Sequence, residues 1–477
     1  MIFVVSAVLV ATVVWYLHRR VTRRTNLPPG PTPLPFFGNV FQLDSIAPWE
    51  TFSRWGREYG EFNHLHILGR TLLVVNSRSL ATELMDKRSS IYSDRPELAM
   101  VQLTGWDHSL IFIRYHDPRW RKIRRLFHSG LGPASASNIQ ALLIAECDRL
   151  LVRLPDRLQN HKKHFLRYAT RSSMEHLLSL SNKEEYDNIT DYNSEAVDAM
   201  SAYVFFGSQA LFAMPALKYM PSWFPGAGFQ KYSAEQSQLT ARIRNEPYSF
   251  VKTQMLTDEH SPSWLADTLE NNATGNRTAA SEDDIKDAVG SMITGTGETT
   301  SSGLMTLLLA LLLHPDVQLR AQAEIDRIVG PHRLPSFEDQ SSLPYISAIC
   351  RESLRWHVPV PLTAHATSED DLYQGYEIPA GTTIVLNIWA MSRDPSKFMD
   401  ADKFIPERFI TKDGTLSLED ETSFAWGFGR RLCPGRHFAE AAIWVMAARL
   451  LAVFNIKKAK DSNGAEIESS RAVSVRI

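Results

Sequence analysis

The chain has 477 residues, of which 44% are hydrophobic and 22% are charged, a composition typical of a large globular protein with a substantial core. Its formal net charge is -2 and no long basic run lies outside the N-terminal segment, which argues against nucleic acid as a partner. The three widely spaced cysteines predict neither a disulfide framework nor a zinc site, and they favour a reducing compartment.

The first seventeen residues carry no charge and are followed by the basic run HRRVTRR. Because roughly 17–25 apolar residues span a bilayer as a helix, residues 1–17 are predicted to be a retained transmembrane helix. The rival interpretation is a cleaved signal peptide, but the basic residues of a signal peptide precede the apolar run. The positive-inside rule then places the body of the protein in the cytosol, where the sequons at Asn188, Asn272 and Asn276 stay unglycosylated.

Residues 18–38 form the basic flank and a proline-rich hinge, in which LPPGPTPLP predicts a semi-rigid spacer. Residues 39–477 are predicted to be one domain, since no change of composition divides them. TLLVVNS indicates a buried strand, and YQGYEIPAGTTIVLNIWAM has the alternation and turn residues of a hairpin. Most other segments show helical spacing, so the predicted fold class is mainly α with small β-sheets.

The longest helical pattern runs from near Asp283 to about Leu313 and contains ITGTGETTSSG. A glycine inside a helix costs about 1 kcal/mol relative to alanine, and the hydroxyl side chains compete for backbone hydrogen bonds. We therefore expect a local opening of this helix, in which Glu298 and Thr299 place an acid and a hydroxyl suited to proton delivery. The alternative is a packing irregularity where another element crosses.

Cys433 stands between a loop rich in glycine and arginine and an amphipathic helical pattern, in SFAWGFGRRLCPGRHFAEA. The free amides and the dipole at a helix N-terminus favour an anion, which predicts a lowered thiol pKa and a thiolate. Gly427, Gly429 and Gly435 let the backbone approach something large and flat. The alternative is a buried structural cysteine, the usual role of an isolated one.

Two further pairs have helical spacing. Glu352 and Arg355 lie at i and i+3 in CRESLRWH and can pair on one helix face. If partly buried, they would form a bidentate ion pair with a scaffolding role. Arg408 of PERF is the third member of this predicted group. Trp120 and Arg124 lie at i and i+4 on a basic helix. Either they form a solvated face, or an indole N–H and a guanidinium reach the carboxylates of a bound ligand.

In their order and spacing these motifs resemble the cytochrome P450 family of haem-thiolate monooxygenases, in its membrane-bound eukaryotic class. The family's loop Phe-x-x-Gly-x-Arg-x-Cys-x-Gly corresponds here to Trp426, Gly429, Arg431, Cys433 and Gly435. GTGETT matches the oxygen-binding helix motif, and the likeness extends to about Asn455. The fungal secondary-metabolism and xenobiotic branch is the most similar, in RWHVPVPLTAHATSEDDLYQGYEIPAG and FNIKKAKDSNG.

The resemblance implies a single large helical domain with the cytochrome P450 fold, and haem b as its cofactor with the iron axially ligated by Cys433. Glu298 and Thr299 would deliver protons to bound dioxygen. One oxygen atom would enter a small lipophilic substrate, such as a terpenoid, polyketide or aromatic compound, by hydroxylation or epoxidation. The residues that would hold the haem propionates are Trp120, Arg124, His365 and Arg431.

The resemblance also implies electron supply by NADPH-cytochrome reductase, with cytochrome b5 as a further donor, because the chain has no flavin or dinucleotide fingerprint. The location would be the endoplasmic reticulum membrane, with a single span and a cytosolic catalytic domain. Residues 104–113, 217–229 and 360–364 match positions that line the substrate pocket or its entrance. The segment 223–225 would also contact membrane lipid.

Three departures from the family pattern open alternatives. Trp426 replaces the usual Phe. Thr296 replaces a usual Gly beside the oxygen-binding groove, where it would crowd dioxygen or alter the proton relay. The segment after Gly464 is shorter than the family's terminal hairpin. A haem-binding pseudoenzyme or poorly coupled oxidase would consume NADPH without forming product. A membrane-anchored helical protein without cofactor is the remaining alternative, and the haem content of purified protein would distinguish it.

Overall fold

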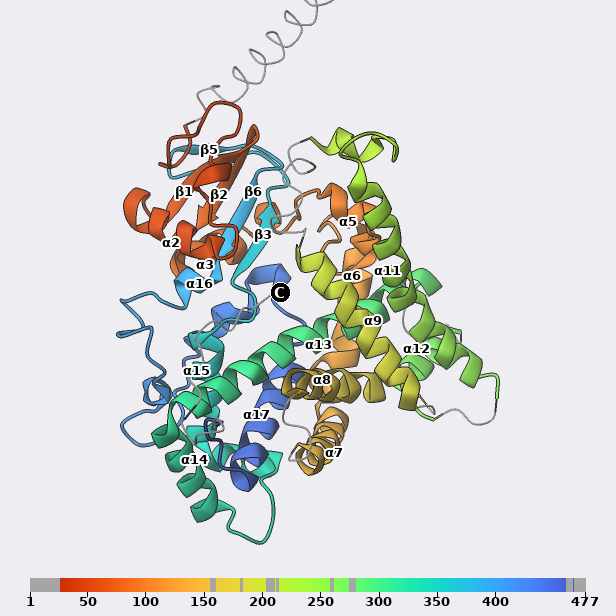
Figure 1. Cartoon of the computed structure of the whole chain (residues 1–477), viewed down its shortest axis with the longest axis vertical. Coiled ribbons are helices and arrows are strands. Elements are labelled where there is room, and N and C mark those ends of the chain that lie inside the picture. Colours follow the sequence, from red (N-terminus) through yellow and green to blue (C-terminus); the bar gives the residue numbers. More distant parts are fainter. Residues whose placement is uncertain are drawn as a thin grey trace, which may run out of the picture.

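The structure, a computed structural model, describes residues 26–154, 160–180, 183–202, 211, 214–257, 261–273, 280–459 and 466. Helices make up most of it, and two small sheets lie toward one end of the molecule (Figure 1). This architecture confirms the predicted mainly α class with small β-sheets. The predicted transmembrane helix, the sequon at Asn276 and nearly all of the chain after Gly464 lie outside the described residues.

The larger sheet has the strand order β1-β2-β6-β3, in which β1 and β2 form a hairpin, β6 runs parallel to β2, and β3 is antiparallel to β6. Its bounds are Phe62–Ile67, Arg70–Val75, Thr383–Asn387 and Leu362–Ala366 for β1, β2, β6 and β3. The predicted buried strand is β2, whose last four residues are buried.

The predicted hairpin is divided between the two sheets. Strands β4 (Asp371–Tyr373) and β5 (Tyr376–Ile378) pair with each other, whereas β6 leaves them and joins the larger sheet. All five residues of β6 are buried, and the strand is paired along both edges because it lies between β2 and β3 in the larger sheet.

Most helices pack around one large hydrophobic cluster, and smaller clusters lie beside it. The α-helices are α2 (Pro48–Tyr59), α3 (Arg78–Thr82), α4 (Ser89–Tyr92), α5 (Ala99–Leu103), α6 (Pro118–Leu131), α7 (Ala136–Arg153), α8 (His161–Leu178), α9 (Lys183–Ala202), α11 (Gly228–Gln254), α12 (Trp264–Ala273), α13 (Glu282–Leu313), α14 (Pro315–Ile328), α15 (Pro344–Trp356), α16 (Ile388–Met391) and α17 (Arg436–Val453). Short 3-10 turns used below are η3 (Trp106–His108), η8 (Phe337–Ser342), η9 (Pro406–Phe409), η10 (Ser423–Trp426) and η11 (Gly429–Arg431).

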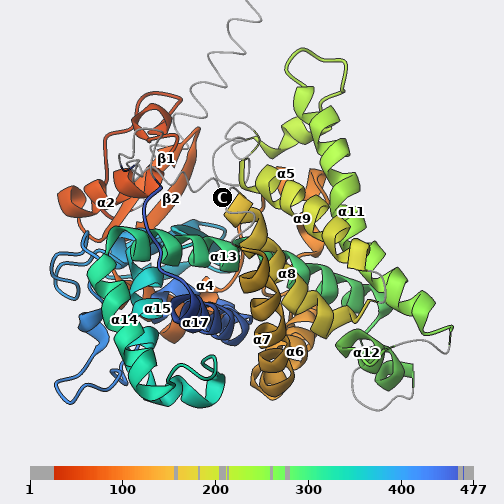
Figure 2. The same ribbon diagram turned by 60° about the horizontal axis from the view of Figure 1, so that its bottom comes forward.

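Helix α13 confirms the predicted long helix and crosses the centre of the helical body, with α6, α8, α11 and α17 packed around it (Figure 2). It begins with a capping box, in which Ser281 Oγ accepts a hydrogen bond from Asp284 N at 3.1 Å. It ends before Pro315 because proline cannot continue a helix. Among the described residues α13 is also the one helix long and apolar enough to cross a membrane, and 56% of that apolar window is buried inside the fold.

The two glycines of α13 have different surroundings. Every residue of α13 is helical, so the expected local opening is not observed. A Cβ on Gly297 would lie only 2.7 Å from Thr170 Cγ2 of α8, so this glycine permits close helix packing. A Cβ on Gly295 would have no atom within 4 Å. The packing alternative therefore applies at Gly297, and Gly295 borders open space.

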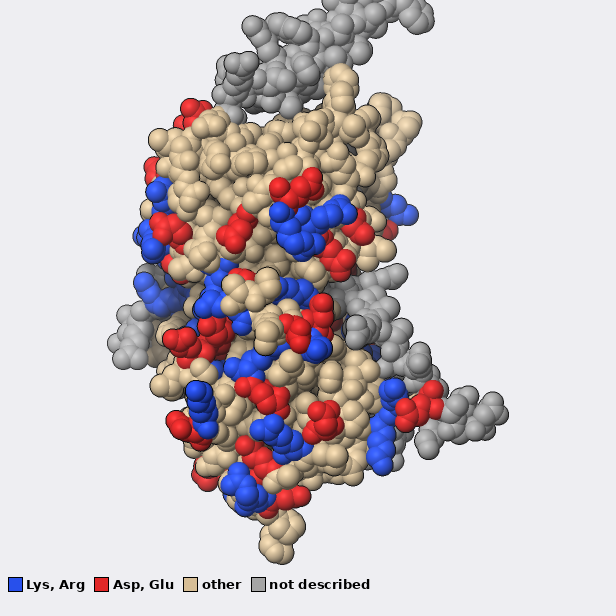
Figure 3. All heavy atoms as spheres, turned by 90° about the vertical axis from the view of Figure 1, so that its left-hand side faces the viewer, with Lys and Arg blue, Asp and Glu red and all other residues tan. Residues whose placement is uncertain are grey.

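Charges of both signs alternate on the face that includes α2 and α16 (Figure 3). Lys and Arg side chains there lie beside Asp and Glu side chains rather than in one basic stripe. Exposed pairs such as Arg320 with Glu407, 2.6 Å apart, illustrate this mixing. A face of this kind lacks the electrostatic footprint of a nucleic-acid site.

Candidate active site

The loop that carries Cys433 is held in a tight turn. The Cys433 N–H donates to Trp426 O at 2.8 Å. Gly427 and Gly429 have φ angles of 81° and 53°, in the left-handed region that favours glycine. A Cβ on Gly429 would lie 2.1 Å from Met85 O, so the loop approaches that backbone as closely as a glycine allows. The Cys433 side chain ends up half-buried just before α17.

The thiol environment differs from the sequence-based prediction. Burial raises the pKa of Cys433, while the Gly435 N–H and the charge of Arg124 act in the opposite direction without cancelling it. The prediction of a lowered pKa is therefore wrong for the protein without a ligand, because desolvation outweighs the helix end. Burial raises the pKa of Cys147 and of Cys350 to about 12.

One face of α13 is open. Gly295 and Thr299 are exposed, although most residues around them in α13 are buried. They lie at i and i+4, on one face of the helix, and Thr299 Oγ1 donates to Gly295 O at 2.8 Å. An exposed stripe on the central helix of the fold leaves room for a bound molecule.

Glu298 and Thr296 engage the neighbouring helices α9 and α8. Ser194 Oγ of α9 donates to Glu298 Oε1. Burial raises the pKa of Glu298, although the Ser194 hydrogen bond and the charge of Lys162 oppose the shift. Thr296 Oγ1 lies 2.8 Å from Ser173 Oγ of α8, so the hydroxyl that replaces the family's usual glycine is held by that helix.

A cluster of cationic and aromatic side chains contains three of the four predicted propionate ligands. The Arg431 guanidinium lies 5.1 Å from the centroid of the Trp120 ring. Burial, and then the charges of Arg95 and Arg124, lower the pKa of Arg431 to about 8. Trp120 Nε1 is buried without a hydrogen-bond partner. Within the described part of the chain, Arg124 forms no hydrogen bond or ion pair.

His365 on β3 is the fourth predicted ligand and belongs to the same cluster. Its Nδ1 lies 3.2 Å from Tyr92 O and must donate there, because a carbonyl oxygen only accepts. Burial, followed by the charges of Arg95 and Arg431, holds the pKa of His365 well below its usual value. The imidazole is therefore neutral, with Nε2 as an acceptor.

Arg95 belongs to this cluster but was missed by the sequence reasoning. Its Nη1 donates to Ala364 O, its Nε is buried without a partner, and burial lowers its pKa to about 10. It follows α4 in an irregular stretch without helical or strand periodicity. Its significance arises from residues far along the chain, so no local pattern marks it.

The predicted scaffolding pair is present and buried. Glu352 and Arg355 are both fully inaccessible to solvent and form two hydrogen bonds of 2.6 and 2.7 Å. Arg355 also donates to the carbonyl oxygens of residues 392, 401 and 403. Arg408 Nε lies 3.5 Å from Glu352 Oε1, as the third member. The pair thus fixes the segment that leads into the Cys433 loop.

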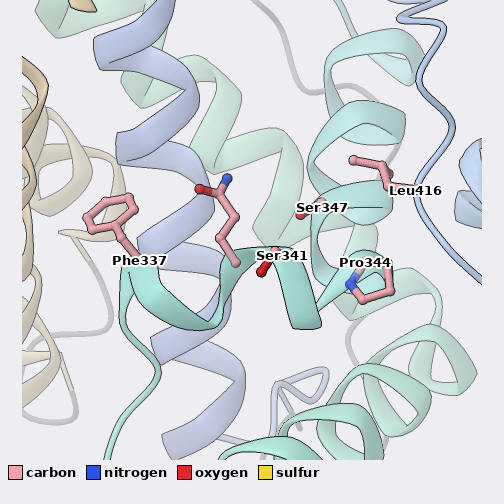
Figure 4. Close-up of a pocket in the computed structure, with 6 residues that line it drawn as sticks. Phe337, Ser341, Pro344, Ser347 and Leu416 are labelled. Atoms are coloured by element: carbon pink, nitrogen blue, oxygen red, sulfur yellow. The ribbon is translucent and has the colours of Figure 1, made fainter.

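A pocket of about 440 Å3 lies elsewhere, between η8, the start of α15 and the loop at Leu416 (Figure 4). None of the predicted site residues and no charged side chain line it. It therefore lacks groups for acid–base chemistry or metal binding, and it is not the candidate active site. Its lining residues are Phe337, Gln340, Ser341, Pro344, Ser347 and Leu416.

The described residues thus include a half-buried thiol at Cys433, an open face on α13 and a cationic cluster with unpaired donors. Comparison with known proteins then supplies the family. Residues 28–476 match the family model described as Cytochrome P450. The chain therefore belongs to the cytochrome P450 family, and it is a monooxygenase.

Fungal relatives cover nearly the whole chain. Cytochrome P450 monooxygenase 98 of Postia placenta is 35% identical over 468 residues, which cover 96% of this chain and 88% of the relative. Cytochrome P450 monooxygenase ppsD of Aspergillus oryzae is 38% identical, with coverage of 96% and 88%. Tryptamine 4-monooxygenase of Psilocybe cyanescens is 33% identical, with coverage of 98% and 94%.

Proposed function

We propose that this monooxygenase binds haem b through the Cys433 thiolate and inserts one oxygen atom of dioxygen into a small lipophilic substrate. The observation that carries the proposal is the half-buried Cys433 thiol together with the unpaired donors of Trp120 and Arg124. When bound, haem with a thiolate ligand supplies the chemistry that cleaves the O–O bond. The protein contributes binding, orientation and proton supply.

The cationic cluster fits the two propionates of haem. Buried cations without enough counter-charge are unfavourable, and two carboxylates would balance the guanidinium charges of Arg95, Arg124 and Arg431. The unpaired Trp120 N–H would donate to the same carboxylates. His365 can donate only after Nε2 is protonated, and a nearby carboxylate favours that by raising the pKa of the imidazole.

Cys433 fits the role of metal ligand even though its free thiol has a raised pKa. A bound metal ion deprotonates a coordinating thiol outright. The Gly435 N–H and the start of α17 then stabilise the sulfur charge. Trp426 lies at the beginning of the same turn and accepts the Cys433 N–H through its carbonyl oxygen.

Thr299 and Glu298 are proposed to deliver protons. The Thr299 hydroxyl is on the open face of α13, where a reacting molecule has access. Glu298 is half-buried with a raised pKa, which brings a carboxyl group closer to the working pH of a general acid. Glu298 contacts α9 through Ser194 and interacts electrostatically with Lys162 of α8.

The partners, location and substrate follow the family. We propose NADPH-cytochrome reductase as the electron donor, with cytochrome b5 as a further one, at the endoplasmic reticulum membrane with a single span and a cytosolic body. Trp223 and Phe224 are 78% and 48% exposed, which supports lipid contact by that segment. The chemistry is hydroxylation or epoxidation in fungal secondary metabolism or xenobiotic oxidation, and the named relative that acts on tryptamine favours an aromatic substrate.

The absorption spectrum of the reduced, carbon monoxide-bound protein tests this proposal. We expect the red-shifted Soret band of a thiolate ligand, its loss in Cys433→Ala, and its retention in the control Cys147→Ala. An unshifted, histidine-type band in the folded wild-type protein would contradict the assignment of Cys433. A purified protein without haem would overturn the proposed function as a whole.

A further inference from the structure

Arg431 does more than face the cationic cluster. Its Nε donates to Ser93 O at 2.8 Å, its Nη1 to Leu110 O at 3.2 Å and its Nη2 to Ile113 O at 2.7 Å. These carbonyl oxygens belong to the two ends of one stretch of chain, here called the 93–115 segment. One side chain from the Cys433 loop therefore closes that segment into a loop.

Additional contacts join the ends of the 93–115 segment to each other. Asp94 accepts two hydrogen bonds from Arg114, at 3.0 and 2.7 Å, and one from Tyr115 N at 2.9 Å. Arg430, next to Arg431, donates to the Tyr115 hydroxyl and lies 4.9 Å from the centroid of its ring. The Cys433 loop thus holds both ends of the segment through two successive arginines.

The middle of the 93–115 segment lies against α11 and α13. It contains α5 and η3; α5 packs against α11, and Leu110 N donates to Ser291 Oγ of α13 at 3.1 Å. From its resemblance to the family, residues 104–113 are expected to line the substrate pocket. A shift of this segment would therefore change a wall of the substrate pocket.

The charges around Arg431 are incompletely balanced without a ligand. Arg95 and Arg124 both act on it repulsively, and Asp94 balances them only in part because its oxygens already accept from Arg114 and Tyr115 N. Mutual repulsion in a low-dielectric site favours separation of the arginines. Two ligand carboxylates in this cluster would hold the arginines together, and Arg431 would then keep its grip on the carbonyl oxygens.

We propose that Arg431 is a positioning residue that couples the carboxylates of the bound cofactor to the conformation of the 93–115 segment, and thereby to the shape of the substrate pocket. The inference rests on the proposed function, since it takes the haem propionates as the anions of the cluster. The inference goes beyond the proposed function by assigning a second effect to those propionates. They order a pocket wall in addition to anchoring the cofactor.

Hydrogen exchange of the backbone amides tests the coupling. The wild-type protein is compared in two loaded forms, one with haem and one with haem whose two propionates are methyl esters. The reporters are amides of the segment with a defined acceptor, namely those of Thr104, Leu110 and Ile113. With the ester we expect about tenfold faster exchange at these amides, on the scale of one lost hydrogen bond to a charged group, and unchanged exchange in α14.

A variant provides the second arm. Arg431→Lys keeps the charge, but its three N–H groups sit on one nitrogen and cannot reproduce the planar fork in which Nε, Nη1 and Nη2 reach three separate carbonyl oxygens. Its haem-loaded form should therefore show the same rise in exchange. Arg125→Lys, an exposed arginine of α6, is the matched control and should behave as wild type. Equal exchange with haem and with its ester overturns the coupling, even where Arg431→Lys fails to fold. A haem-loaded wild type without the thiolate Soret band overturns the proposed function itself.

Discussion

Replacement of Glu352 by glutamine should weaken the fold and loosen the Cys433 loop together. Glu352→Gln keeps the size of the side chain but leaves the Arg355 guanidinium buried without its counter-charge. Removal of one partner from a buried ion pair costs about 3–5 kcal/mol of the free energy of unfolding. The substitution also weakens the acceptor of Ile405 N, which lies 2.8 Å from Glu352 Oε1. Because a domain is stable by only about 5–15 kcal/mol, the variant should fold but with a large loss.

The assay is chemical denaturation of the variant and of a matched control, followed by the carbon monoxide spectrum. Glu235→Gln is the control, since Glu235 forms an exposed pair with Lys231 at 4.0 Å, and it should change stability by about 0.5 kcal/mol or less. Glu352→Gln should also lower the fraction of protein with the thiolate Soret band. Equal stability of the two variants would refute the energetic reasoning. A destabilised variant with a full thiolate band would refute the link to the Cys433 loop.

Three further predictions concern α13 and the sheet. Thr299→Ala should retain haem but divert electrons from NADPH into peroxide, and an unchanged product yield per NADPH would remove Thr299 from proton delivery. Gly297→Ala should lower the free energy of unfolding by about 1–3 kcal/mol because its Cβ overlaps Thr170 Cγ2. Gly295→Ala should be neutral or stabilising by up to about 1 kcal/mol. The reverse order of denaturation midpoints would contradict the packing of α13 against α8. Burial, and then the charge of the neighbouring His64, lowers the pKa of His66 from 6.5 to about 4. The folded protein therefore disfavours the protonated ring. The contribution to stability is complete above pH 6.5 and is lost as the pH falls toward 4. At pH 5 the loss should be about 2 kcal/mol, and His66→Gln should flatten the dependence of the denaturation midpoint on pH; an equally steep dependence in the variant would assign the effect to other groups.

Local chemistry made much of this protein readable from the sequence. The ends of α13 follow from Ser281, whose side chain caps the first turn, and from Pro315, which cannot extend the helix. Strand β2 follows from a short apolar run, and the family follows from the residues around Cys433. In each case the signal is a cap, a period or a motif within a few residues, where the backbone's own hydrogen bonding and side-chain spacing decide the outcome.

The tertiary structure alone decided the features that depend on distant neighbours. The thiol pKa of Cys433 rises rather than falls because packing removes water from it, and desolvation outweighs the helix end. Strand β6 leaves the predicted hairpin to pair along one edge with β2, which lies far from it in the sequence, and along the other edge with β3. Arg95 comes close to Arg431 only after the chain folds, so the local sequence does not indicate that the two charges interact. Burial and electrostatic coupling are sums over neighbours in space, and a linear pattern does not contain those neighbours.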